Sequence, residues 1–162
     1  MRRFIPGILI LLCAVALAQT ASKPAAKPAA EDHKAWAPAE LKWGPAPDVL
    51  PAGAQLAVLE GDPMKSGEFT MRLKMPNGYK LPPHFHARME HVTLLSGGFH
   101  VGMGDKFDES KMAGVPVGTF IWIKPGVHHF AMAKGETIIQ LHGNGPWTLT
   151  YVNPSDDPRK KK

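Results

Sequence analysis

The sequence predicts an all-β fold, a sandwich or a small closed barrel, made by a single domain. Short runs with apolar alternation or β-branched residues recur between Ala54 and Val152, and Gly, Pro, Asn or Asp bounds each run. Strands do not alternate with helical patterns, which argues against a parallel, nucleotide-binding sheet. A length of 162 residues suits one domain with a core of its own.

Residues 1–18 are typical of a secretory signal peptide. Arg2 and Arg3 precede an apolar run that ends at Ala18, where small residues favour cleavage. The apolar run is too short to cross about 30 Å of hydrocarbon, so a stable membrane anchor is not expected. We therefore predict an exported protein, periplasmic or secreted.

A flexible linker and a proline-rich extended segment, called the strap below, are expected between the signal peptide and the strands. Residues 19–35 are rich in Ala, Pro and Lys and predict a flexible linker, because they offer little apolar surface to bury. The predicted domain spans residues 36–158. It begins with a proline-rich strap whose Trp36 and Trp43 are expected to pack onto the domain. Residues 159–162 form a basic tail.

Eight strands are expected, separated by turn dipeptides such as Asn77-Gly78, Gly97-Gly98 and Lys134-Gly135. A helical turn is expected only in residues 105–114. The expected strands cover residues 54–61, 68–76, 90–98, 99–104, 118–126, 128–135, 136–143 and 147–154.

Charge and cysteine content limit the chemistry. The formal net charge is +5, but residues 36–158 carry ten Lys or Arg against twelve Asp or Glu, so the basic charge lies in the terminal segments. No nucleic-acid motif is present, and a nucleic-acid partner is not expected.

The single cysteine, Cys13, lies in the signal peptide. The mature chain therefore has neither disulfides nor thiolate ligands.

The stretch GYKLPPHFHARMEHVTLLSGG carries the candidate site. On a strand His84 and His86 face the same side about 7 Å apart, so both imidazoles can reach one ion. Glu90 keeps the same phase and adds an anionic oxygen. His128 or His129 could supply a fourth ligand. The alternative is that these residues are hydrogen-bonded polar groups at a barrel mouth, with no metal.

The spacing around these residues resembles the cupin superfamily. Gly78, His84, His86, Glu90 and Gly97 match every fixed position of its first signature.

The second signature fits at Gly118, Gly126 and His129. Lys124 stands where it has proline, and Ala133 where it has asparagine. The resemblance is to small exported single-domain cupins and covers essentially the whole folded part. It implies a cupin-type jelly-roll β-barrel, which commonly forms a homodimer.

By the same resemblance His84, His86, Glu90 and His129 would bind a metal. Strand alternation also favours His129 over His128, because His129 shares its face with Ala131, which leaves room for a substrate. Three imidazoles and one carboxylate suit a divalent Mn, Fe, Ni or Zn ion.

Further polar side chains are weaker candidates for the site. Gln140 and His142 share a strand face and could orient a ligand or substrate, although half-buried sheet residues fit the pattern as well. Arg88 could meet a substrate carboxylate or lie solvated in a turn. The aromatic residues Phe120, Trp122 and Trp147 are expected in the core.

These observations favour a metal-binding cupin enzyme acting on a small oxygenated organic molecule. Dioxygenation, decarboxylation and isomerisation are the reaction types that such a metal supports. One alternative is a non-catalytic module of the cell envelope that binds or senses a small ligand or a metal. Another is a metal-free epimerase or lyase that uses the histidines as acid and base. The sequence does not identify a general base.

Overall fold

The structure is a computed structural model that describes residues 33–160. The predicted signal peptide and linker residues 19–32 lie outside this range. The chain divides into two units, Met1–Lys34 and Ala35–Lys162, and the second contains every element described below. No helix within the described range is long and apolar enough to cross a membrane.

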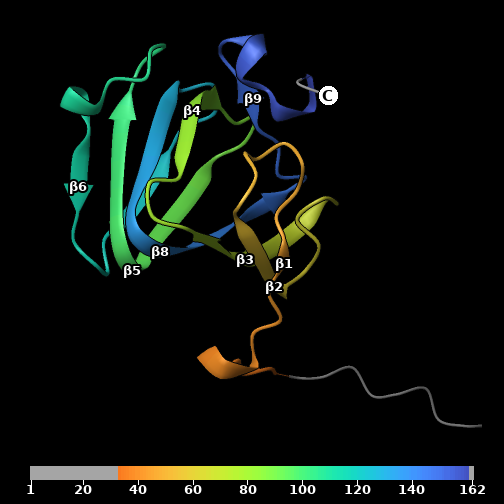
Figure 1. The fold of residues 1–162 in the computed structure, drawn as a ribbon. Coiled ribbons are helices and arrows are strands. Elements are labelled where there is room, and N and C mark those ends of the chain that lie inside the picture. Colours follow the sequence, from red (N-terminus) through yellow and green to blue (C-terminus); the bar gives the residue numbers. More distant parts are fainter. Residues whose placement is uncertain (1–32, 161–162) are drawn as a thin grey trace, which may run out of the picture. The chain divides into compact units, whose positions relative to one another are not determined.

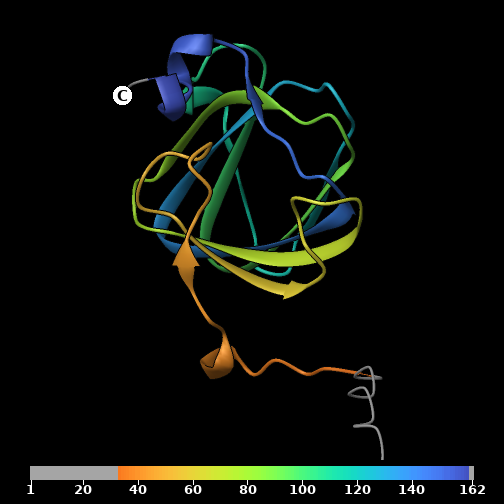
Figure 2. The same cartoon turned by 90° about the vertical axis from the view of Figure 1, so that its right-hand side faces the viewer.

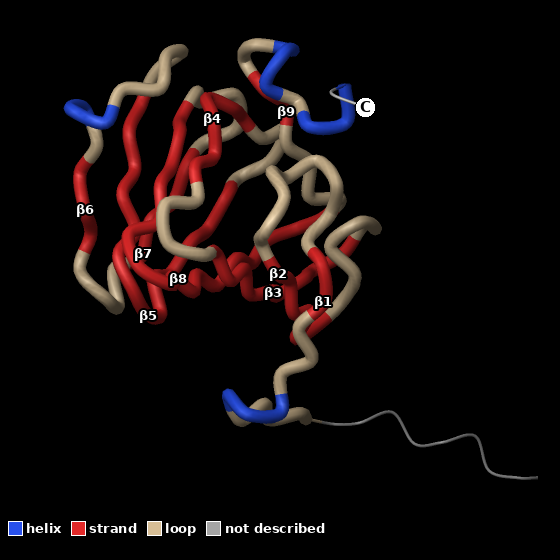
Figure 3. The backbone as a smooth tube through the Cα atoms, in the orientation of Figure 1, coloured by secondary structure: helices blue, strands red, loops and turns tan. Residues whose placement is uncertain are grey.

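Residues 33–160 form nine strands that pair antiparallel in one curled sheet (Figures 1 and 2). Helical structure in this range is limited to four single 3-10 turns (Figure 3). The strands are β1 (Gly44–Pro45), β2 (Gln55–Glu60), β3 (Gly67–Met75), β4 (Lys80–Phe85), β5 (Glu90–Met103), β6 (Ala113–Val115), β7 (Phe120–Ile123), β8 (His129–Gly145) and β9 (Thr150–Tyr151). The turns are η1 (Pro38–Glu40), η2 (Glu109–Lys111), η3 (Pro154–Asp156) and η4 (Pro158–Lys160).

Two long strands, β5 and β8, pair with each other and belong to both layers of the barrel. The second half of β8 pairs with β3, and its first residues pair with β4. The first half of β5 pairs with β7, and its second half pairs with β6. One layer is therefore β1-β2-β3-β8-β5-β7 and the other is β9-β4-β8-β5-β6. This arrangement is the jelly roll that the sequence implied.

The two layers join where β5 and β8 bend. Gly97 has a φ of +83°, and a Cβ on Gly98 would lie 2.8 Å from the Lys134 carbonyl oxygen, so both positions need glycine. The buried Thr137 hydroxyl donates to the Gly98 carbonyl (3.0 Å) and accepts from the Gly98 amide (3.2 Å). The predicted strand breaks after residue 98 and after residue 135 are wrong, because β5 and β8 are continuous bent strands.

Both tryptophans of the strap contact the domain, as expected. The Trp36 Nε1 donates to the Leu59 carbonyl (2.8 Å), and the Lys74 ammonium lies 4.5 Å from the centre of the Trp43 ring. At the other end of the domain, Arg159 of the predicted basic tail makes an ion pair with Asp157 at 2.7 Å.

The core prediction was wrong for Phe120 and Trp122, which are 53% and 55% exposed. Their strand, β7, pairs only with β5, and its neighbouring residues Ile121 and Ile123 face the barrel interior. Because side chains alternate along a strand, the two aromatic rings face solvent. Trp147 is partly buried and packs against the core, in agreement with the prediction.

Candidate metal centre

Three histidines meet inside the barrel. His84 lies near the end of β4, His86 just beyond it, and His129 is the first residue of β8. All three are buried, and each offers a ring nitrogen within 4.8 Å of the others. The structure therefore brings together His84, His86 and His129, as the sequence predicted.

Hydrogen bonds to the backbone orient each of the three rings. Each Nδ1 lies within hydrogen-bond distance of a carbonyl oxygen: Pro82 for His84 (2.7 Å), Thr148 for His86 (2.6 Å) and Val127 for His129 (3.0 Å). A carbonyl oxygen can only accept, so Nδ1 carries the proton and donates it. In a neutral ring the Nε2 lone pair is then left to bind a metal ion.

Glu90, the first residue of β5, lies beside these nitrogens. Its two carboxylate oxygens are each 3.3 Å from a histidine Nε2, one from that of His86 and the other from that of His129. The His86 contact lacks hydrogen-bond geometry, so this buried Nε2 has no hydrogen-bond partner in the structure. An unpartnered buried nitrogen beside a carboxylate is what a site built for a cation would present. The residues present therefore fit a metal ion.

The protonation states favour the same interpretation. Burial, together with the smaller effects of the neighbouring His129 and His86, lowers the pKa of His84 to about 3. Burial alone would raise the pKa of Glu90, but hydrogen bonding from His129 and positive charge on the surrounding histidines, both of which require a ring also protonated at Nε2, hold it below its ordinary value. A metal ion bound at Nε2 would supply positive charge in the same place. Near neutral pH the site thus offers a neutral imidazole at His84 and a carboxylate at Glu90, as metal binding requires.

A cavity opens beside this group. Together with the open space at its mouth it measures about 480 Å³. Its polar lining consists of the three histidines and Glu90. The remaining lining side chains are apolar: Leu73, Met75, Leu81, Val92, Phe99, Val101, Ile121, Ile123, Ala131, Ile139 and Leu141.

The structure separates His128 from the cavity. Its Nδ1 lies 2.6 Å from an Asp105 carboxylate oxygen, and its ring stacks on Phe85 with centroids 5.1 Å apart. His129 lines the cavity together with Ala131, which agrees with the alternation used to choose between the two histidines.

The other candidate residues do not line the cavity. Gln140 and His142 alternate with Ile139 and Leu141, which do line it, so they face the outer side of the sheet. There Gln140 accepts a hydrogen bond from Arg72 (3.1 Å).

His142 stacks on His91, with ring centroids 5.0 Å apart. Arg88 is exposed in the turn before β5. Of the alternatives given by the sequence, the structure thus favours half-buried sheet residues for Gln140 and His142 and a solvated turn residue for Arg88.

Sequence reasoning missed the segment that supports His86. The Thr148 carbonyl accepts from His86, and the neighbouring Trp147 ring lies 5.7 Å from the His86 ring. No sequence motif links His86 to Thr148, which lies 62 residues later in the chain. A backbone carbonyl has no side-chain signal that a sequence pattern could detect.

The fold and this histidine group together define a cupin. The family model of the ChrR cupin-like domain matches residues 31–148. This match covers more than half of the chain, which therefore belongs to that family.

Three solved structures show the same fold at low identity. They are the polyketide cyclase RemF from Streptomyces resistomycificus (17% identity, TM-score 0.60, 79% of this chain and 91% of that one), an acetylacetone dioxygenase from Acinetobacter johnsonii (17%, 0.58, 81% and 84%) and an RmlC-like cupin from Shewanella frigidimarina (14%, 0.52, 67% and 87%). No curated protein sequence matches the chain.

Proposed function

We propose that this chain is a metal-dependent enzyme that acts on a small oxygenated organic molecule. The observation that carries the proposal is that backbone carbonyls hold the Nδ1 atoms of all three rings, which leaves the Nε2 lone pair of each neutral ring for a metal ion. The likeness to an acetylacetone dioxygenase adds support for oxygen chemistry on a dicarbonyl compound. Decarboxylation and isomerisation belong to the same range of reactions.

In this proposal His84, His86, His129 and Glu90 hold the ion. The donor set of imidazole nitrogens and a carboxylate oxygen, with no sulfur, suits a divalent Mn, Fe, Ni or Zn ion. Such an ion supplies Lewis-acid or oxygen-activating chemistry. The backbone carbonyls fix the imidazoles in the ligating tautomer, and the apolar side chains exclude water from the bound substrate.

Elemental analysis of the purified protein tests the proposal. We expect about one first-row metal ion per chain, lost in His86→Ala and retained in His91→Ala. His91 is a suitable control because it follows Glu90 in β5 but lies on the outer face of the sheet, stacked on His142. The proposal fails if wild type and His86→Ala contain the same amount of metal and this amount is well below one ion per chain.

A non-catalytic binding module is the second candidate, and the composition of the cavity favours it. Among residues 33–160, no lining side chain apart from the three histidines and Glu90 can take up or release a proton. A protein that retains metal, binds small diketones tightly by calorimetry and consumes none of them with oxygen present would support this candidate over the enzyme. A normal rate after removal of the metal would instead indicate metal-free acid–base catalysis.

We also propose export of the chain, on the basis of residues 1–18. Fractionation of the producing cells and N-terminal sequencing of the mature protein test this. A mature protein in the periplasm or medium that begins at Gln19 is expected. A cytoplasmic protein that keeps residues 1–18 would contradict the proposal.

A further inference from the structure

We propose that the cavity selects ligands whose body, beyond the oxygens that reach the histidines, is uncharged and apolar, and that it rejects ligands with a carboxylate in that part. This proposal rests on the proposed metal-centred function and names its substrate class. It concerns the apolar side chains of the cavity rather than the metal-binding residues.

The first argument is the composition of the cavity wall as residues 33–160 form it. Eleven apolar side chains surround the space beside the histidines, and no lysine or arginine of these residues lines it. Apart from the three histidines and Glu90, the described lining offers no polar side chain. A charged group placed there would lose its hydration without gaining a partner, which is strongly unfavourable.

The second argument is the charge balance at the site. Glu90 is the one acidic side chain that lines the cavity among residues 33–160, and it lies beside the Nε2 atoms of His86 and His129. A divalent ion with this carboxylate and neutral imidazoles leaves one net positive charge. One anionic oxygen donor of a ligand neutralises it. A second negative charge on the ligand would have no counter-ion within the cavity.

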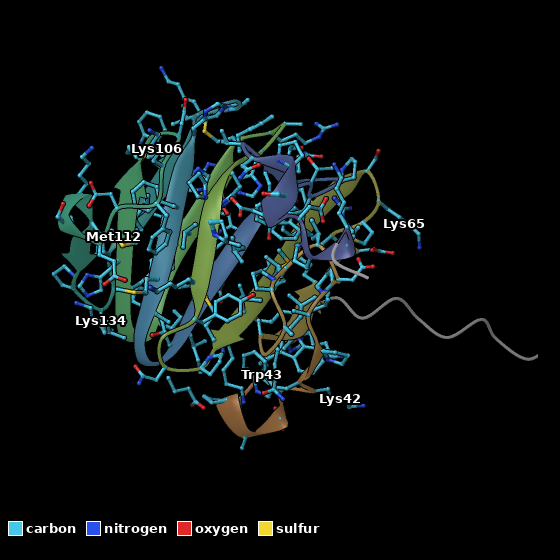
Figure 4. The ribbon with its side chains drawn as sticks, turned by 45° about the horizontal axis from the view of Figure 1, so that its top comes forward. Lys42, Trp43, Lys65, Lys106, Met112 and Lys134 are labelled. Atoms are coloured by element: carbon cyan, nitrogen blue, oxygen red, sulfur yellow. The ribbon has the colours of Figure 1, made fainter. Side chains whose placement is uncertain are left out.

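The third argument is the position of the basic side chains. Four lysine side chains are exposed on the outer surface of the sheet and its loops (Figure 4): Lys42, Lys65, Lys106 and Lys134. Arg88, the basic residue closest in sequence to the ligands, is exposed and does not line the cavity. None of these side chains lies in the cavity wall, where it could pair with the carboxylate of a bound ligand.

A matched pair of probes tests the selectivity. 2,4-Octanedione and 4,6-dioxoheptanoate carry the same β-diketone and tails of similar size, and only the second ends in a carboxylate. We expect 2,4-octanedione to bind at least about 100-fold more tightly than 4,6-dioxoheptanoate does. The affinities are measured by calorimetry under nitrogen, on protein loaded with Ni²⁺. 2,4-Pentanedione reports binding of the diketone without a tail. Equal affinity for the two larger probes, or no binding of either, would overturn the inference.

Substitutions on one strand test the location of the effect. Ile121 lines the cavity but is only half-buried, so the ammonium of Ile121→Lys can stay close to water while it faces the ligand. We expect this variant to bind 4,6-dioxoheptanoate at least about 10-fold more tightly than wild type does. Phe120→Lys, on the outer face, should match wild type.

Val101→Lys provides a second cavity variant on a different strand. If both Ile121→Lys and Val101→Lys fold and neither improves carboxylate binding relative to Phe120→Lys, the inference fails.

The measurements distinguish this inference from the proposed function. Elemental analysis decides whether a metal is bound, and the ratio of the two affinities decides whether the cavity rejects charge. A protein that retains metal but binds both probes equally refutes only the inference. A protein that retains no metal refutes the proposed function. In that case the same ratio on metal-free protein still tests the inference, and loss of the preference for 2,4-octanedione overturns it.

Discussion

His84 should make the stability of the metal-free protein strongly dependent on pH. The pKa of this buried side chain is about 3 in the folded protein, against an ordinary value of 6.5. As the pH falls, the unfolded chain therefore takes up the proton first. The contribution to stability is complete above about pH 6.5 and is lost progressively toward about pH 3.

The size of the effect follows from the difference in pKa. One pKa unit corresponds to about 1.4 kcal/mol, so His84 accounts for about 5 kcal/mol over the whole range and about 2 kcal/mol between pH 6.5 and pH 5. The upper part of this range isolates the histidine. Glu90 has a folded pKa below its ordinary value of 4.5, so its own contribution is lost only at lower pH.

Urea unfolding followed by tryptophan fluorescence, with chelator present, measures the effect. Between pH 6.5 and pH 5, the free energy of unfolding should fall by about 2 kcal/mol less in His84→Gln than in wild type. Above about pH 7.5 the difference between the two proteins should be constant, which provides the internal control. Parallel curves from pH 7.5 to pH 5 would refute the reasoning.

Three more predictions concern the site and the bend. His129→Ala should lose the metal and His128→Ala should keep it in elemental analysis; equal metal contents would contradict the assignment. Thr137→Val removes the hydroxyl that bonds Gly98 and should lower the unfolding free energy by about 1–3 kcal/mol in urea, whereas an unchanged midpoint would show that this contact contributes nothing. Free metal at about 100 times its dissociation constant should stabilise wild type by about 3 kcal/mol, and the same shift in His86→Ala would exclude binding through His86.

The strand pattern predicted the fold class but not the strand boundaries. Gly97 and Gly98 were interpreted as a break between two strands, because glycine usually ends a strand. In the structure they bend a continuous β5, and the contact with Thr137 holds the bend. A local pattern cannot distinguish these outcomes, since the contact that decides them comes from β8.

Alternation predicted the inward side chains correctly where the two faces of a strand differed clearly in side-chain size. His129 and Ala131 were placed together in the cavity as expected. At Phe120 to Ile123 every residue is apolar, so the pattern contained no signal for which face is buried. Gln140 and His142 shared a face, as predicted, but the face was the outer one. The phase of these strands is set by pairing with their neighbours.

The hydrogen bond between His86 and Thr148 ties the metal-binding geometry to closure of the barrel. The carbonyls that orient His84 and His129 come from the same local segments as those rings, whereas His86 depends on a residue 62 positions later, just before β9. The affinity for an added metal ion would thus measure how completely the C-terminal segment has docked, because a barrel left open there would lack one correctly oriented imidazole. A metal titration during refolding would follow the formation of this long-range contact rather than the collapse of the core.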